Sequence, residues 1–104
     1  MLKVKTKNSK EYIMCSAIHF DDGRVHVHQP INITRGFVVA GRRHHNCFHT
    51  LKACGHPSGT SMLSIQGFLT SEDRFVTREI AADLAFKAGQ IDKKITSLFS
   101  ENIW

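Results

Sequence analysis

The chain has 104 residues, of which 41% are hydrophobic and 22% are charged, and this composition is typical of one folded domain rather than of a disordered segment. The formal net charge is +5, but four of the positive charges belong to lysines within residues 1–10, so we expect no broad basic surface for duplex nucleic acid. Three cysteines without paired spacing argue against a disulfide scaffold, and the lack of an apolar run of roughly 18 residues or of a signal-peptide pattern argues against a membrane anchor or export.

The first part of the chain predicts three strands. Residues 12–20 are rich in apolar and β-branched side chains, and residues 21–24 contain an Asp-Gly pair that favours a tight turn. Val25–His28 alternates with a period of two, so we expect it to pair back on the first strand and to end before Pro30, which cannot donate to a ladder. Residues 36–40 predict the third strand.

The middle and the end of the chain predict helices around one more strand. Residues 43–53 have apolar side chains at helical spacing, with Gly55 as the stop. Residues 64–70 predict a strand, and Phe75–Val76 a brief extended segment. Thr77 is a good N-cap for a helix to Ala88, which Gly89 ends. Its expected apolar stripe is Ile80, Ala81, Leu84, Ala85 and Ala88.

We therefore expect an α+β fold, in which a small antiparallel sheet packs with two to three helices in a single domain over residues 1–104. The apolar residues of the tail, 91–104, are expected to pack on the domain or on a neighbouring subunit. Residues 1–10 form a basic N-terminus that we expect to be frayed and solvated.

The segment Gly41–His49 combines two arginines, three histidines, an asparagine and a cysteine directly after an apolar run. Arg42 and Arg43 lie at the start of one expected helix, and Arg78 opens another, where the helix dipole disfavours a cation by about 0.3–1 kcal/mol. Helix starts and guanidinium groups both bind phosphate, so these arginines predict an anion site. The alternative for Arg78 is an ion pair with Glu79 or with Glu72–Asp73, or simple solvation.

Phenylalanines accompany the arginines of the second half of the chain. Phe68 precedes Arg74, and Phe75 lies between Arg74 and Arg78, so Phe68 or Phe75 is a candidate to stack on a base. The alternative is that each phenylalanine belongs to the core. His44, His45 and Asn46 are candidates to hydrogen-bond riboses or a base edge.

The histidines and cysteines also allow metal or nucleophilic chemistry. The possible zinc ligands are His26 and His28, His45 and His49, and Cys54 and His56. However, the sequence has no CxxC pair and no HExxH, so we expect neither a metal nor another cofactor. Cys47 with His44 or His49 is the one candidate for nucleophilic catalysis, and it lacks an evident orienting group beyond Asn46.

Several short segments together carry a family resemblance. They are Gly41–Cys47, Gln66–Ser71, Arg74–Glu79 with Ala81 and Ala85, Ala88–Gln90 and Leu98–Glu101. Over about residues 12–104 the sequence resembles small phage proteins of the type-one Thoeris anti-defence family, which sequester cyclic ADP-ribose-type immune signals. Some members also hold cyclic oligonucleotides from CBASS systems.

The resemblance implies a non-catalytic sponge that encloses its ligand, assembles as a dimer or hexamer, and acts in the cytoplasm of the infected bacterium. Its candidate ligand-binding residues are Arg42, Arg43, His44, His45, Asn46, Phe68, Thr70, Arg74, Phe75 and Arg78. Two alternatives remain: a metal- or His-dependent phosphodiesterase-like enzyme that uses the histidines, and a small nucleic-acid-binding protein that uses Lys3, Lys5, Lys7 and Lys10.

Overall fold

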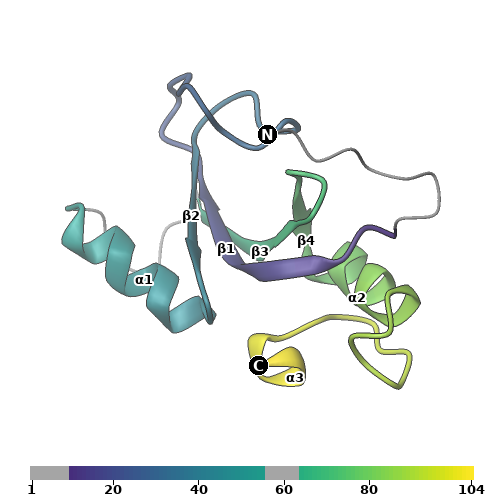
Figure 1. The fold of residues 1–104 in the computed structure, drawn as a ribbon. Helices are drawn as coiled ribbons and strands as arrows, with labels where there is room; N and C mark the ends of the chain where they lie inside the picture. Colours follow the sequence, from purple (N-terminus) through teal and green to yellow (C-terminus); the bar gives the residue numbers. More distant parts are fainter. Residues whose placement is uncertain (1–9, 56–63) are drawn as a thin grey trace, which may run out of the picture.

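The computed structural model describes residues 10–55 and 64–104, and it contains a four-stranded antiparallel sheet in the order β2-β1-β3-β4 (Figure 1). The expected α+β class is therefore confirmed. The strands are β1 (Ile13–Phe20), β2 (Phe37–Gly41), β3 (Ser64–Thr70) and β4 (Phe75–Thr77), and the helices are α1 (His44–Ala53), α2 (Arg78–Lys87) and α3 (Ser100–Ile103). Figure 1 shows α1 and α2 beside opposite halves of the sheet, with α3 and the C-terminal end between them.

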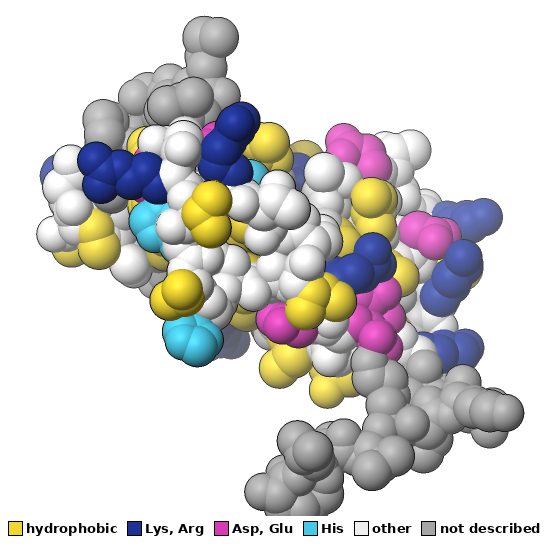
Figure 2. All heavy atoms as spheres, turned by 90° about the horizontal axis from the view of Figure 1, so that it is seen from above, with side chains coloured by type: hydrophobic (Ala, Val, Ile, Leu, Met, Phe, Trp, Pro, Cys, Tyr) yellow, Lys and Arg dark blue, Asp and Glu magenta, His cyan; other side chains and the backbone are white. Residues whose placement is uncertain are grey.

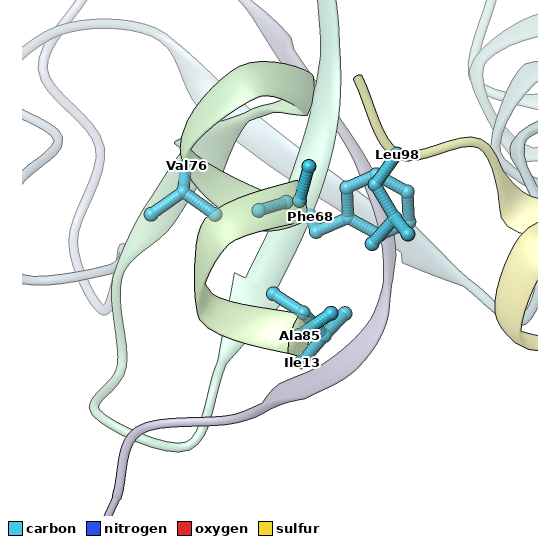
Figure 3. Close-up of a cluster of buried hydrophobic side chains, with 7 residues drawn as sticks. Ile13, Phe68, Val76, Ala85 and Leu98 are labelled. Atoms are coloured by element: carbon cyan, nitrogen blue, oxygen red, sulfur yellow. The ribbon is translucent and has the colours of Figure 1, made fainter. Parts of the chain in front are cut away.

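Both helices cover the same face of the sheet. Residues that are directly opposite each other on neighbouring strands point to the same face of a sheet. Ile18 pairs with Val39 below α1, and Phe68 pairs with Ser16 on one side and with Val76 on the other, on the half of the sheet that α2 covers. One apolar cluster, made by β1 and β2 with α1, contains Ile18, Phe20, Val39, Cys47 and Leu51. The other, shown in Figure 3, contains Ile13, Phe68, Val76, Ala81, Ala82, Ala85 and Leu98.

The tail after α2 packs on the domain, which is one of the two arrangements we expected. Leu98 is fully buried, and Ile91, Ile95, Ile103 and Trp104 pack against the same cluster. The side-chain amide of Gln90 donates to the carbonyl oxygen of Ile13 and accepts from its N–H, each at 2.8 Å. Hydrogen bonds from Arg43 to Trp104 and from His44 to Ser100 place the last residues of the tail beside the start of α1.

The hairpin expected at Val25–His28 is wrong. The position beside β1 belongs to β2, whose Phe37–Gly41 pairs with Ser16–Phe20, and Val25 makes only an isolated parallel bridge to Gly36. Asp21 and Asp22 accept hydrogen bonds from the N–H groups of Gly23 and Arg24, and these local bonds begin a long connection instead of a tight hairpin.

The expected helices are confirmed, with small changes at their ends. Thr77 caps α2 by accepting from the N–H of Ile80 at 3.5 Å, and Gly89 after the helix has a φ of +78°. The expected apolar stripe is wrong at Ile80, which is 49% exposed, because the face buried against the sheet consists of the small residues Ala81, Ala82 and Ala85.

Charged side chains are dispersed on the face of the described chain that Figure 2 shows. Lysine and arginine side chains stand at separate places there, with acidic and apolar side chains between them. This face therefore presents no continuous basic surface. Lys3, Lys5 and Lys7 lie outside the described residues, whereas the ammonium group of Lys10 donates to the carbonyl oxygen of Lys87 at 3.2 Å.

Candidate functional site

The candidate site forms where β2 and β4 end. Gly41, the last residue of β2, lies opposite Ser16 of β1. Thr77, the last residue of β4, lies opposite Gly67 of β3. Gly67 in turn pairs with Ala17, the neighbour of Ser16 in β1. Both strands thus end at the same level of the sheet. The arginines that follow them begin α1 and α2 at that level.

The turn into α1 is compact because Gly41 has no side chain. A Cβ at Gly41 would lie 3.0 Å from the Cβ of Asn46, closer than side chains ordinarily pack. Arg43 is the N-cap with extended φ and ψ angles of −129° and 162°, and its N–H donates to the Asn46 side-chain oxygen at 3.1 Å. Asn46 therefore stabilises the start of the helix.

His44 joins the start of α1 to the sheet and to the tail. Its Nε2 lies 2.8 Å from the carbonyl oxygen of Gly67, and its Nδ1 lies 2.6 Å from Ser100 Oγ. Because a carbonyl oxygen can only accept, the neutral ring carries its proton on Nε2 and accepts from the Ser100 hydroxyl at Nδ1. The same hydroxyl oxygen accepts from the His44 N–H at 3.1 Å and lies 2.9 Å from Ser16 Oγ. The Ser100 hydroxyl is thus fully used in holding α3 against α1.

Burial lowers the pKa of His44 below its ordinary value of 6.5, and the positive charge of Arg78 lowers it further, while the Gly67 carbonyl and Glu101 act in the opposite direction. The unfolded chain therefore binds a proton at this position before the folded chain does. The contribution of neutral His44 to the free energy of unfolding is therefore fully present above about pH 6.5. It is lost as the pH falls below that value toward the lower pKa of the folded state.

A His44→Gln variant should lose part of this pH dependence. We expect the denaturant midpoint of the wild type to fall between about pH 7.5 and about pH 5.5, and that of the variant to fall less, since glutamine does not titrate. His45→Gln, which removes an exposed histidine of the same helix, is the matched control and should keep the wild-type dependence. Equal pH dependence in His44→Gln and the wild type would contradict this role.

Arg43 and Arg78 are each held by a main-chain oxygen of the tail. The Arg43 guanidinium donates at 2.7 Å to the main-chain oxygen of Trp104, the last residue of the sequence. Arg78 donates to the carbonyl oxygen of Leu98 at 3.0 Å and to the side-chain oxygen of Gln66, and its guanidinium lies 4.5 Å from the centre of the Phe99 ring. Within residues 10–55 and 64–104, no Asp or Glu side chain pairs with either arginine, so the ion pairs considered for Arg78 do not form there.

Burial lowers the pKa of Arg78, while Glu101 and Glu79 raise it. A guanidinium stays protonated in spite of such shifts, so Arg78 keeps a partly desolvated positive charge. A charge of this kind is well placed to bind an anion, because it has already lost part of its hydration.

Two adjoining pockets lie at these arginines. The larger, of about 500 Å³, is lined by Arg42, Arg43, His45, Asn46 and Trp104. The smaller, of about 300 Å³, is lined by Arg43, His44, His45, Arg78, Phe99, Ser100 and Glu101. Arg43 and His45 border both pockets, so the two can accept one ligand that extends across them. We call them together the arginine cleft.

The comparisons with known proteins identify a family. The model of a family described as "Phage T4 y16D protein" matches residues 12–104. The chain belongs to this family. None of the curated proteins and none of the solved structures is similar enough to count as a match. As a member of the y16D family the chain is a phage protein, and the matched range includes every residue that lines the arginine cleft.

The structure brings together six of the ten residues that the sequence suggested for this y16D-family protein. They are Arg42, Arg43, His44, His45, Asn46 and Arg78. The tail adds Phe99, Ser100, Glu101 and Trp104, which the sequence reasoning did not select as site residues. The available signals in the sequence are the apolar residues of the tail, which include Phe99 and Trp104, and the family resemblance of the segment Leu98–Glu101.

The other four candidate residues lie elsewhere. Phe68 is fully buried and Phe75 is 7% exposed, so neither ring offers a free face for a base. Thr70 is buried and donates to the Glu11 carboxylate, which also accepts two hydrogen bonds of 2.8 Å from Arg74. The positive charge of Arg74 is thus neutralised, and these four residues line neither pocket of the cleft.

A separate pocket of about 480 Å³ lies in the connection after β1, lined by His19, Asp21, Val25, Asn32, Ile33, Thr34 and Arg35. Arg35 forms an ion pair with Asp21 at 3.1 Å there, so its positive charge is also compensated. Among the pockets described here, the arginine cleft is therefore the better anion site.

The described residues that could bind a metal or act as a nucleophile are the histidines and cysteines. No group of three metal-binding side chains occurs there, and His26 bonds to Asp22 at 2.8 Å. His56 lies outside the described residues. Burial raises the pKa of the Cys47 thiol to about 11, so the reactive thiolate is scarce at neutral pH. No helix in the described ranges is long and apolar enough to cross a membrane.

Proposed function

We propose that this phage protein binds a cyclic nucleotide immune signal in the arginine cleft and sequesters it without cleaving it, which inhibits the defence of the host. The observation that carries the proposal is the gathering of Arg42, Arg43 and Arg78 at two adjoining pockets, with no Asp or Glu side chain bonded to any of them among the described residues. Isomers of cyclic ADP-ribose are the first candidates, and cyclic oligonucleotides the second, because of the resemblance to Thoeris anti-defence proteins.

The cleft offers distinct groups for each part of such a ligand. The three arginines bind the phosphates, since a guanidinium fork matches two phosphate oxygens and replaces the water that the phosphates lose. His45 and Asn46 border the larger pocket and hydrogen-bond ribose or base. Phe99, which is 46% exposed, and Trp104 line the pockets and stack on a base of the ligand, in place of Phe68 or Phe75.

Isothermal titration calorimetry with cyclic ADP-ribose isomers tests the proposal. We expect binding, and we expect chromatography to recover the ligand intact after the complex is denatured by heat. A chemically altered ligand would point to a phosphodiesterase-like enzyme instead, and the absence of binding to any cyclic nucleotide would remove the proposal.

Assembly and location belong to the same proposal. A cleft that is open on one protomer encloses a ligand better when a second protomer covers it, so we expect a dimer or hexamer that acts in the cytoplasm of the infected host. Light scattering after gel filtration, with and without ligand, measures the assembly. A monomer in both conditions would contradict this part.

A further inference from the structure

The smaller pocket contains one acidic side chain among its cations. Glu101 lies in the first turn of α3 and is exposed, and it borders the pocket together with Arg43, His45 and Arg78. It is close enough to raise the pKa of both Arg78 and His44. Yet across the part of the chain that the structure describes, its carboxylate forms no ion pair and accepts no side-chain hydrogen bond. Its oxygens therefore remain available to a ligand.

A carboxylate at this position divides the cleft into two chemical halves. Like charges repel, so the position beside Glu101 disfavours a phosphate, whereas the positions beside Arg42, Arg43 and Arg78 favour one. An ionised carboxylate can only accept hydrogen bonds, so the group beside Glu101 must donate them. The neutral donors that accompany phosphate in a nucleotide are the ribose hydroxyls and the amino group of a base, and the ribose hydroxyls are the donors that acidic side chains bind in dinucleotide sites.

We propose that Glu101 accepts hydrogen bonds from the hydroxyls of a ribose and makes the cleft selective for ribonucleotides over free phosphates and deoxynucleotides. The proposal rests on the proposed function, since the arginines hold the phosphates of the same ligand. It also fixes the orientation of the ligand, with its phosphates toward the three arginines and its ribose toward Glu101 on α3.

Three probes and two variants test the role of Glu101 by calorimetry. The probes are cyclic ADP-ribose, its analogue without ribose 2′-hydroxyls, and inorganic pyrophosphate. The wild type should bind cyclic ADP-ribose roughly tenfold or more tightly than the deoxy analogue, because a hydrogen bond to a charged group is lost. Glu101→Gln should abolish most of this preference. The same variant should bind pyrophosphate as tightly as the wild type or more tightly, because a repelling charge is removed.

Glu79→Gln is the matched control. Glu79 also raises the pKa of Arg78, but it lies on α2 and does not line the cleft. We expect it to keep the preference for ribose. If Glu101→Gln weakened the binding of pyrophosphate as much as that of cyclic ADP-ribose, Glu101 would be a structural residue and the inference would fail. Equal binding of both nucleotides by the wild type would also overturn it while leaving the proposed function intact, whereas no binding of any probe would overturn both.

Discussion

Arg78→Ala should weaken the binding of a cyclic nucleotide by about 2–5 kcal/mol, as the loss of one partner of a desolvated charge pair usually does. Its guanidinium is held between Leu98, Gln66 and the ring of Phe99, so it needs little reordering to meet a phosphate. Titration calorimetry measures the change, and circular dichroism checks that the variant is folded, because the same side chain also ties α2 to the tail.

Arg74→Ala is the control for this prediction. Arg74 is also an arginine of the β4 region, but its charge is neutralised by Glu11 and it lies outside the cleft. We expect unchanged affinity from Arg74→Ala, and an intermediate affinity from Arg78→Lys, which keeps the charge and loses the fork. If Arg74→Ala and Arg78→Ala reduced the affinity equally, the arginine cleft would not be the binding site.

The local signals of the sequence were sufficient to locate both helix starts at the cleft. Apolar side chains at helical spacing predicted the helix over residues 43–53, and Thr77 predicted the N-cap of the other helix, and both features depend on neighbouring residues alone. The sequence could not show that the two starts lie at the same level of the sheet. That proximity depends on the registers of β1 with β2, of β1 with β3 and of β3 with β4, and the pairing of β1 with β3 joins residues far apart in the chain.

The errors in the sequence interpretation have the same origin. Val25–His28 has the alternation of a strand, but the position beside β1 was filled by Phe37–Gly41, whose side chains are more apolar. Phe68 has the same neighbours in sequence whether it stacks on a ligand or packs in the core, and its burial is decided by α2 and the tail. Glu101 and Phe99 reach the cleft because contacts distant in sequence attach the tail to the domain, among them those of Gln90 with β1 and of Ser100 with α1.

Phe68→Ala should reduce the free energy of unfolding by about 3–5 kcal/mol, as the removal of a fully buried phenylalanine usually does. The ring packs among Ile13, Val76 and Leu98, and its centre lies 5.0 Å from that of His44, so the cavity would border the network that holds α3 (Figure 3). Denaturant unfolding followed by circular dichroism measures the loss.

Phe68→Leu and Phe99→Leu then separate a core role from a stacking role. Phe68→Leu fills most of the space, so the folded variant should be less stable than the wild type and should bind the ligand equally well. Phe99→Leu changes an exposed ring, so the variant should be as stable as the wild type. Its affinity for the ligand should fall by about 1–3 kcal/mol, because the stacking of the ring on a base is lost. If the affinity fell in Phe68→Leu and not in Phe99→Leu, the ligand would contact the hydrophobic core around Phe68, and the arginine cleft would not be the binding site.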